Sequence, residues 1–175
     1  NHYAAAWGTA FAVVRYGNVM GSRGSVIPLF RRLASEGEPL PITDQRMTRF
    51  WITLPQAVDF VVSCFEDMSG GELYVPRIPS MRVTDLAEAV APGAPIVEIG
   101  IRPGEKLHEE MISTEDSRRA VRRDDRYLVL PTLAEWGFTN TWGDSVEDGF
   151  SYTSETNDLW LDVPELVAML DELGL

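Results

Sequence analysis

Short apolar runs alternate with helical segments along this chain, and that alternation limits the possible folds more than any other feature of the sequence. Residues 11–15 form an apolar, β-branched run typical of a buried parallel strand, and a polar, glycine-rich stretch follows it. Residues 54–68 carry apolar side chains at helical spacing, and residues 73–75 form the next short strand. We therefore expect an α/β fold in which helices cover strands, with no linker dividing the chain.

The remaining segments continue the same alternation. A helix is predicted from Pro28 to Gly37, and the prolines that follow it predict extended chain over residues 39–42. Further expected elements are a capped helix over 84–90, strands over 96–99 and 127–130, a turn-rich stretch over 136–148 and a terminal helix over 163–173. The helical spacing predicts that the following residues are core: Leu54, Ala57, Val58, Val61, Phe65 and Met68.

Composition excludes several classes of partner. A chain of 175 residues with 45% hydrophobic residues is long enough for one domain with a core. Its formal net charge of -12 repels nucleic acid and anionic membrane surfaces, so we expect neither as a partner. No apolar run approaches the ~20 residues that a membrane span requires. A small anionic ligand would have to be bound by individual arginines in this acidic protein.

The cysteine and the first residues indicate the setting of the protein. Cys64, the single cysteine, cannot form a disulfide within the chain, which favours a reducing, cytoplasmic location. Residues 1–8 contain neither an initiator methionine nor a helix start signal, and they have the pattern of a helix that ends at Gly8. We therefore expect the native polypeptide to extend upstream.

The glycine-rich stretch at residues 17–25 is a candidate ligand loop. Glycines between a strand and a helix commonly cradle phosphates. The spacing here matches neither G-x-G-x-x-G nor a P-loop, and no acidic residue ends a second strand at the distance that a ribose contact needs. A ligand loop of another kind is the favoured interpretation, ahead of a plain structural turn and of a true dinucleotide fingerprint.

Two arginines and one histidine are the other candidates for a site. Arg49 alternates with bulky residues in an extended segment, so its guanidinium either lies on the surface or turns inward to an anion. Arg102 begins a loop directly after a strand, where a phosphate contact competes with simple solvation. His108 precedes two glutamates but lacks the second histidine of H-E-x-x-H, so no metal site is predicted.

Several longer strings resemble a known family. They are VRYGNVMGSRGSVIP at 14–28, PITD at 41–44, RMTRFWIT at 46–53, GGE at 70–72, VP at 75–76, IPSM at 78–81 and IGIRPGEKLHE at 99–109. Together they resemble the inverting UDP-N-acetylglucosamine 4,6-dehydratases, which are extended short-chain dehydrogenases, over nearly the whole chain. The TRFWI and SRG strings resemble this soluble group more than its membrane-anchored, non-inverting relatives.

The resemblance implies a fold and a domain assignment. Residues 1–175 would be the C-terminal, substrate-binding portion, made of the last strands and helices of a Rossmann-type parallel sheet and the small substrate domain. The N-terminal NADP-binding portion would be absent from this chain. The catalytic Tyr-x-x-x-Lys pair and its acidic partner would lie upstream too, because no Tyr-x-x-x-Lys occurs in the 175 residues.

The resemblance also implies site residues. Tyr16 and Gly17 would contact the nicotinamide of NADP. The residues implied for the sugar nucleotide are Asn18, Ser25 and Val26 facing it, Pro41, Ile42 and Thr43 lining a uracil pocket, and Arg49 and Arg102 clamping the diphosphate and ribose with Glu105 close by. Two arginines from separate loops would supply charge-assisted bonds to a diphosphate.

The implied activity belongs to the intact protein. Bound NADP would oxidise C4 of the sugar, the C5 proton and C6 hydroxyl would leave, hydride would return to C6, and C5 would be reprotonated from the opposite face. The product would be a 4-keto-6-deoxy UDP-sugar for surface or flagellar glycans, made by a cytoplasmic homo-oligomer. An epimerase or reductase acting on a related UDP-sugar, and a non-catalytic sugar-nucleotide-binding module, remain the alternatives.

Overall fold

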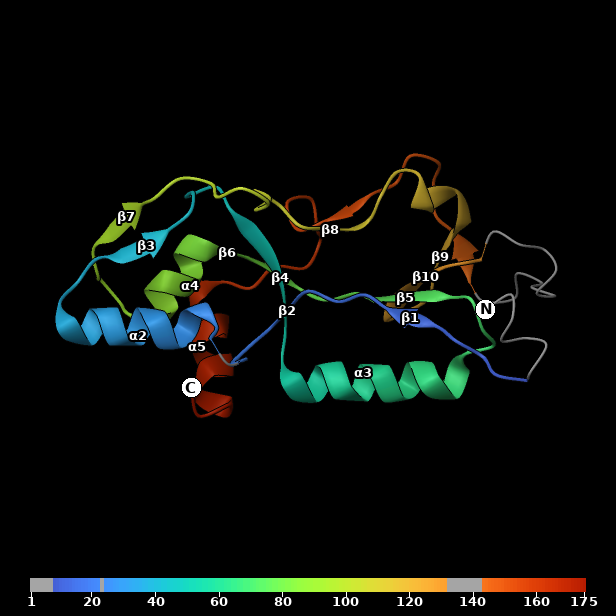
Figure 1. Ribbon diagram of the computed structural model, residues 1–175, viewed down its shortest axis with the longest axis horizontal. Coiled ribbons are helices and arrows are strands. Elements are labelled where there is room, and N and C mark those ends of the chain that lie inside the picture. Colours follow the sequence, from blue (N-terminus) through green and yellow to red (C-terminus); the bar gives the residue numbers. More distant parts are fainter. Residues whose placement is uncertain (1–7, 23, 132–142) are drawn as a thin grey trace. The chain divides into compact units, whose positions relative to one another are not determined.

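The chain forms two compact units, and each unit is made of three separate segments of the polypeptide. A computed structural model describes residues 8–22, 24–131 and 143–175 (Figure 1). The first unit comprises Asn1–Tyr16, Pro55–Arg77 and Glu110–Tyr152, and the second comprises Gly17–Leu54, Ile78–Glu109 and Thr153–Leu175. Each unit has its own sheet and its own apolar core. None of the described helices is long and apolar enough to cross a membrane.

The first unit is built on a mixed five-stranded sheet. Its strand order is β1 (Val13–Val14), β5 (Leu73–Pro76), β10 (Arg126–Val129), β9 (Ala120–Arg122) and β11 (Asp144–Ser145). The β1 and β5 strands run parallel, whereas the other pairs are antiparallel. The unit also contains β8 (Glu110–Ile112), the 3-10 helix η1 (Asp116–Arg119) and the start of β12 (Tyr152–Thr153). An α/β fold is confirmed, but the expected parallel sheet is wrong for every described pair of this sheet except β1–β5.

The first strand is shorter and more exposed than its sequence predicts. Only Val13 and Val14 of the 11–15 run form β1, and the side chains of Phe11 and Val13 are 57% and 60% exposed. The reason is positional, because β1 ends the order of the described strands and pairs with β5 alone. An apolar run predicts burial on both faces only where neighbours cover both faces.

Helix α3 (Leu54–Asp67) confirms the strongest helical prediction, but of its predicted core residues only Ala57 is buried, with Met68 half-buried against the core. Ala57, Phe60 and Cys64 are buried, and Phe60 and Cys64 pack with Tyr74 and Leu128. The adjacent apolar face is exposed instead, and it consists of Leu54, Val58, Val61, Val62 and Phe65. Two neighbouring apolar faces share one helical periodicity, so spacing alone could not say which face the sheet covers.

We expect the exposed apolar face of α3 to promote self-association of the chain. Replacing Val58 and Phe65 by lysine should shift the chain toward monomer, because charged side chains interrupt a continuous apolar patch. Sedimentation velocity at several protein concentrations measures this shift. A double variant of Asp59→Asn and Glu66→Gln changes the net charge equally without altering the patch, so an equal effect from it would contradict the prediction.

The second unit combines two small sheets with three helices. The β2 (Asn18–Val19), β4 (Thr48–Ile52) and β6 (Ser80–Arg82) strands form one sheet, with β2 parallel and β6 antiparallel to β4. The β3 (Leu40–Ile42) and β7 (Ile96–Glu98) strands form a parallel pair. The helices are α2 (Val26–Glu36), α4 (Val83–Val90) and α5 (Val163–Glu172).

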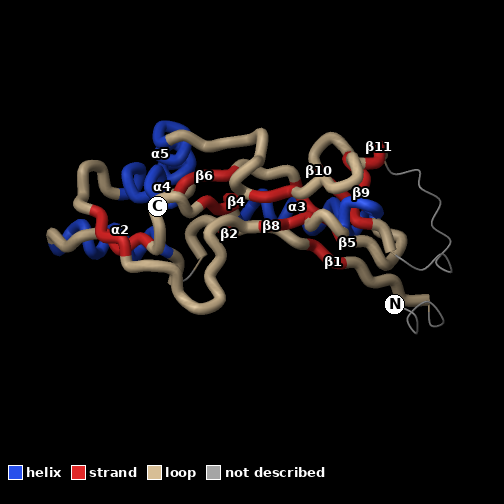
Figure 2. Tube along the Cα trace, turned by 90° about the horizontal axis from the view of Figure 1, so that it is seen from above, coloured by secondary structure: helices blue, strands red, loops and turns tan. Residues whose placement is uncertain are grey.

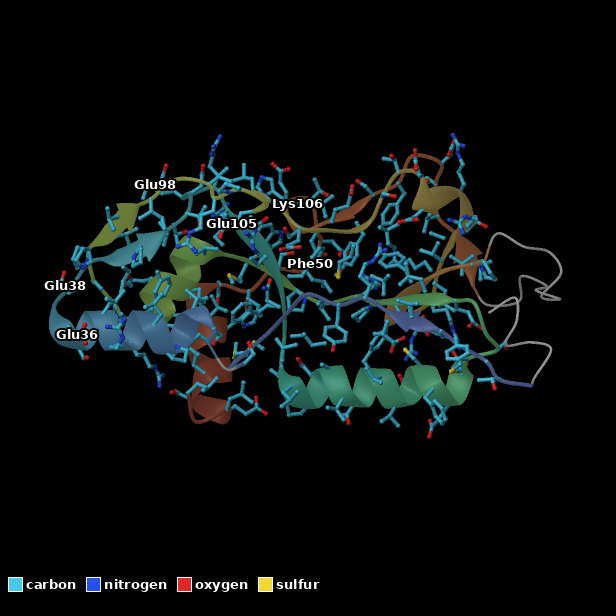
Figure 3. All side chains as sticks on the ribbon, viewed as in Figure 1. Glu36, Glu38, Phe50, Glu98, Glu105 and Lys106 are labelled. Carbon is cyan, nitrogen blue, oxygen red and sulfur yellow. The ribbon has the colours of Figure 1, made fainter. Side chains whose placement is uncertain are left out.

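The core of the second unit brings its helices onto β4 and β6. Helices α4 and α5 lie side by side (Figures 1 and 2), and Leu86 and Leu166 share a buried cluster with Met81 and Trp51. Asp162 and Glu165 form a reciprocal capping box that begins α5. Phe50, labelled in Figure 3, is fully buried on β4. The β4 strand is therefore anchored along its length, which allows it to present side chains at fixed positions.

Most predicted boundaries in this unit are close to the observed ones. Helix α2 begins at Val26 rather than Pro28 and ends at Glu36. Gly37 caps it, with a left-handed φ of 72° that glycine adopts without strain. Helix α4 begins at Val83, and Arg82 at its N-cap makes no side-chain capping bond, so the predicted cap is wrong. Part of the predicted turn-rich stretch, residues 136–142, lies outside the described residues.

Candidate functional site

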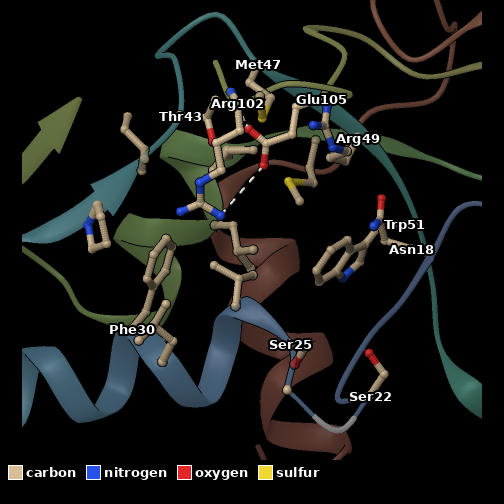
Figure 4. Close-up of a pocket in the computed structure, with 18 of the residues that line it drawn as sticks. Asn18, Ser22, Ser25, Phe30, Thr43, Met47, Arg49, Trp51, Arg102 and Glu105 are labelled. Carbon is tan, nitrogen blue, oxygen red and sulfur yellow. Dashed lines mark hydrogen bonds and ion pairs between the residues drawn. The ribbon is translucent and has the colours of Figure 1, made fainter. Parts of the chain in front are cut away.

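A cavity of about 380 Å³ lies within the second unit (Figure 4). Its walls come from β2 and the loop after it, the first turns of α2, the β3 strand and the turn that follows, β4, β6, the start of α4, and the loop after β7. These segments are far apart in the sequence. Their convergence makes the cavity the candidate ligand site.

Every residue that the resemblance implies for the sugar nucleotide lines this cavity. The set is Asn18, Ser25, Val26, Pro41, Ile42, Thr43, Arg49, Arg102 and Glu105. Tyr16 and Gly17 are not among its lining residues. The structure thus brings the implied substrate set together at one place and leaves the implied cofactor pair outside it.

Arg49 is held in a fixed orientation by its neighbours. Its Nη1 donates to the carbonyl oxygens of Thr48 at 2.7 Å and Leu107 at 3.1 Å, and its Nε lies 3.4 Å from Glu109 Oε1. Only 14% of the side chain is exposed, and this burial lowers the pKa of Arg49 from its ordinary value. A buried, oriented guanidinium beside a cavity is suited to binding an anion with defined geometry.

Arg102 is more loosely held than Arg49. Its side chain is 66% exposed and its Nη1 lies 3.9 Å from Glu105 Oε1. The Oε2 atom of Glu105 accepts bonds from the Arg102 backbone N–H at 3.1 Å and from the Thr43 hydroxyl at 3.3 Å. These contacts tie the 102–105 loop to the turn after β3, while the long, exposed Arg102 side chain can still reorient toward a ligand.

The turn after β3 is stabilised by an internal ion pair. Asp44 accepts bonds from the backbone N–H of Arg46 at 2.8 Å, and from its Nε at 3.0 Å and Nη2 at 2.7 Å. The side-chain and backbone bonds from Arg46 lower the pKa of Asp44 to about 2. The turn presents Thr43 and Met47 to the cavity, and Arg46 is occupied by Asp44.

The rest of the cavity wall is largely apolar. The apolar lining residues are Val19, Val26, Leu29, Phe30, Pro41, Ile42, Met47, Met81, Val83, Leu86 and Ile99. Phe30, Ile42 and Leu86 are fully buried, so this wall is rigid. An apolar slot next to two arginines suits a ligand with a flat ring and an anionic group.

Gly17 has a steric role that the amino-acid sequence did not reveal. A Cβ atom at this position would come within 2.8 Å of the Phe50 carbonyl oxygen and would also collide with the Phe50 Cβ. The close approach of β2 to β4 therefore requires glycine here. Tyr16 is 40% exposed and presents an aromatic ring.

Gly17→Ala should lower the free energy of unfolding by roughly 1–3 kcal/mol, because the methyl group overpacks against the β4 backbone. Urea unfolding of the chain measures this change. Gly24→Ala is the comparison: Gly24 has φ of 74° but no atom within 4 Å of the added Cβ, so its cost comes from backbone strain alone. Unchanged stability of Gly17→Ala would contradict the steric role.

His108 belongs to a hydrogen-bond network. Its Nδ1 lies 2.8 Å from the Thr48 hydroxyl, which is also 2.7 Å from the Ser154 hydroxyl. Ser154 Oγ in turn accepts the backbone N–H of Glu109 at 2.8 Å. Among the described residues, no three His, Cys, Asp or Glu side chains are grouped so that they could hold a metal ion. The network holds the residues that follow the 102–105 loop against β4.

Sequence reasoning missed Trp51 as a site residue. Trp51 lines the cavity together with Arg49, two positions earlier on β4. Side chains two residues apart on a strand point to the same face, so this spacing was the available signal. Ser22 and Met47 were missed as well, and no pattern in the sequence marks them.

The chain matches one family model and several curated proteins. Residues 1–131 match the family described as polysaccharide biosynthesis protein. A UDP-N-acetylglucosamine 4,6-dehydratase (inverting) from Campylobacter jejuni subsp. jejuni serotype O:2 is 50% identical over 172 residues, covering 93% of this chain and 52% of that protein. A UDP-glucose 4-epimerase from Rickettsia canadensis is 40% identical over 125 residues, covering 69% of this chain and 37% of the epimerase.

A solved structure agrees with these matches. Pen from Bacillus thuringiensis superposes with a TM-score of 0.79 and 31% identity, covering 94% of this chain and 49% of Pen. The chain is thus homologous to the inverting UDP-N-acetylglucosamine 4,6-dehydratases. It spans about half the length of the dehydratases that it matches.

Proposed function

Because the chain belongs to the polysaccharide biosynthesis protein family, we propose that its second unit binds a UDP-sugar and that the intact protein is an inverting UDP-N-acetylglucosamine 4,6-dehydratase of the extended short-chain dehydrogenase type. One observation carries the proposal. The residues implied for a UDP-sugar come from separate segments, yet all of them line one cavity that joins two arginines to an apolar slot. In a protein of net charge -12, an anion needs such local positive charge.

Each part of a UDP-sugar has a complementary wall in this proposal. The uracil ring lies against Pro41 and Ile42, and the Thr43 hydroxyl, which donates to Glu105, can accept a bond from the uracil N–H. The diphosphate accepts bonds from Arg49 and from a reoriented Arg102. The Glu105 carboxylate accepts hydrogen bonds from ribose hydroxyls. We assign it to the ribose and not to the diphosphate because a carboxylate and phosphate oxygens are both negatively charged acceptors.

The cofactor in this proposal is NADP, which supplies reversible hydride transfer when bound. Of the residues in this chain, Tyr16 and Gly17 would contact its nicotinamide ring. The chain's contribution to the reaction is to bind the nucleotide and hold the sugar in position. In this proposal the intact protein is cytoplasmic. It acts as a homo-oligomer, and gel filtration with light scattering would test this oligomeric state.

The deciding experiment incubates the intact protein with UDP-N-acetylglucosamine. A 4-keto-6-deoxy product with inverted C5 is expected, and NMR of the product identifies both features. A product changed only in configuration at C4 would replace the dehydratase proposal by the epimerase alternative, which the 40% identity to a UDP-glucose 4-epimerase favours as the second candidate. If the intact protein binds UDP-N-acetylglucosamine but forms no product, the non-catalytic sugar-nucleotide-binding module replaces the dehydratase proposal.

A further inference from the structure

The indole of Trp51 carries a buried donor without an acceptor. Trp51 is 4% exposed and lines the cavity, and within the described part of the chain its Nε1 has no hydrogen-bond partner. Buried donors are almost always paired, because an unpaired one loses its bond to water and gains nothing in exchange. Trp160 shows the ordinary case, since its Nε1 donates to the Asn157 carbonyl at 2.7 Å.

A second unpaired polar atom lines the same cavity. Ser25 lies at the N-cap position of α2 but its hydroxyl makes no capping bond, and its Oγ is buried with no partner among the described residues. A serine at this position would ordinarily accept a bond from the first turn of its helix. Trp51 Nε1 and Ser25 Oγ thus belong to different segments of one cavity wall, and both lack a hydrogen-bond partner among the described residues. This pairing indicates that a bound ligand supplies the missing partners.

Trp51 lies at the neutral end of the cavity. Figure 4 shows Asn18, Ser22, Ser25 and Trp51 toward one end, and Thr43, Arg102 and Glu105 toward the other. Asn18 is also the register partner of Trp51 between β2 and β4. The described residues at this end offer an amide, hydroxyls and an indole N–H, which suit the uncharged oxygens of a sugar better than a diphosphate.

We propose that Trp51 is a positioning residue whose indole N–H donates a hydrogen bond to an oxygen on the sugar of the bound UDP-sugar. This inference rests on the proposed function. Arg49 and Trp51 share one face of β4. In this proposal Arg49 contacts the diphosphate and Trp51, two residues later, contacts the sugar. The rigid strand would thereby set the distance between these two parts of the ligand.

The test compares Trp51→Phe with Trp160→Phe in the intact protein. Calorimetry measures binding of UDP and of the 6-deoxy analogue of UDP-N-acetylglucosamine, which has no C6 hydroxyl to lose. Trp51→Phe should weaken binding of the analogue about fivefold to tenfold, the worth of one hydrogen bond, and leave UDP binding unchanged. Trp51→Phe also leaves a gap in the buried cluster, so its melting temperature without ligand should fall, and benzothienylalanine at position 51, which keeps the shape and lacks the N–H, should leave that temperature unchanged.

Trp160→Phe should also have a lower melting temperature, because it loses a bond within the protein, but its binding of both ligands should be unchanged. If Trp51→Phe proves unstable, benzothienylalanine at position 51 removes the N–H at nearly constant shape. Unchanged binding of the analogue, or equal weakening for UDP and the analogue, would overturn the role proposed for Trp51. A wild-type protein that binds neither ligand would instead overturn the proposed function.

Discussion

Arg49→Ala should weaken UDP binding to the intact protein by about tenfold or more, which corresponds to roughly 1.5–3 kcal/mol for a bond to a charged group. The guanidinium is 14% exposed and already oriented by the Thr48 and Leu107 carbonyls, so ligand binding orders little additional side chain. Lysine at position 49 should restore only part of the affinity, because a point charge cannot reproduce a planar fork. Calorimetric titration with UDP measures all variants.

Arg102→Ala should also weaken UDP binding, but by less than Arg49→Ala. Its side chain is 66% exposed, so solvent screens its charge and binding must order a flexible chain. Arg32→Ala serves as the control, since Arg32 is 58% exposed and pairs with Glu36 on α2 at 3.1 Å. NADP affinity should remain unchanged in all of these variants. Near-wild-type UDP affinity of Arg49→Ala would remove the diphosphate role from this arginine.

Phe50→Ala should lower the free energy of unfolding of the chain by roughly 3–5 kcal/mol, the usual cost of removing a fully buried aromatic ring. Phe50 lies between Arg49 and Trp51 on β4, and its backbone is also the close neighbour of Gly17. The cavity left by the ring would loosen the strand that carries both site residues. UDP binding should therefore weaken together with stability.

Phe65→Ala makes the same substitution at an exposed position and is the matched control. Phe65 on α3 is 76% exposed, so its loss should change the free energy of unfolding by less than about 0.5 kcal/mol. Urea unfolding of both variants, at matched protein concentration, gives the comparison. If the two variants lowered the free energy of unfolding equally, the prediction that burial sets the cost of removing the ring would be wrong.

The identity of the elements was largely determined by local sequence. Gly37 ends α2 because only glycine adopts left-handed backbone there without strain, and Pro39 and Pro41 keep the next segment extended. The alternating residues of 48–52 do form a strand, and the periodic residues of 54–67 do form a helix. These predictions succeeded because they depend on backbone sterics and on side-chain periods within one segment.

The choice of covered face was decided by tertiary structure. Phe65 and Val58 have the same helical spacing as residues that pack, yet the sheet of the first unit covers Phe60 and Cys64 instead. The short β1 is exposed for the same reason, since burial depends on which neighbours are present. Periodicity states which residues share a face, and only packing states what that face meets.

The residues of the candidate site also owe part of their assignment to the sequence and part to the tertiary structure. Local pattern marked Arg49 and Arg102 as candidates without deciding their roles, and only the family resemblance assigned roles to them and to their partners. No local rule could have joined residues as distant in sequence as Asn18 and Glu105. The unpaired N–H of Trp51 is entirely a property of the folded protein, because pairing depends on what surrounds the indole in space. Gly17 shows the converse, a motif residue whose requirement for glycine comes from the β4 backbone that it touches. The sequence by itself thus determined elements such as α2, β4 and α3, which follow from backbone sterics and periodicity within one segment. Tertiary packing decided short strands such as β2 and β8, and which side chains meet around the cavity.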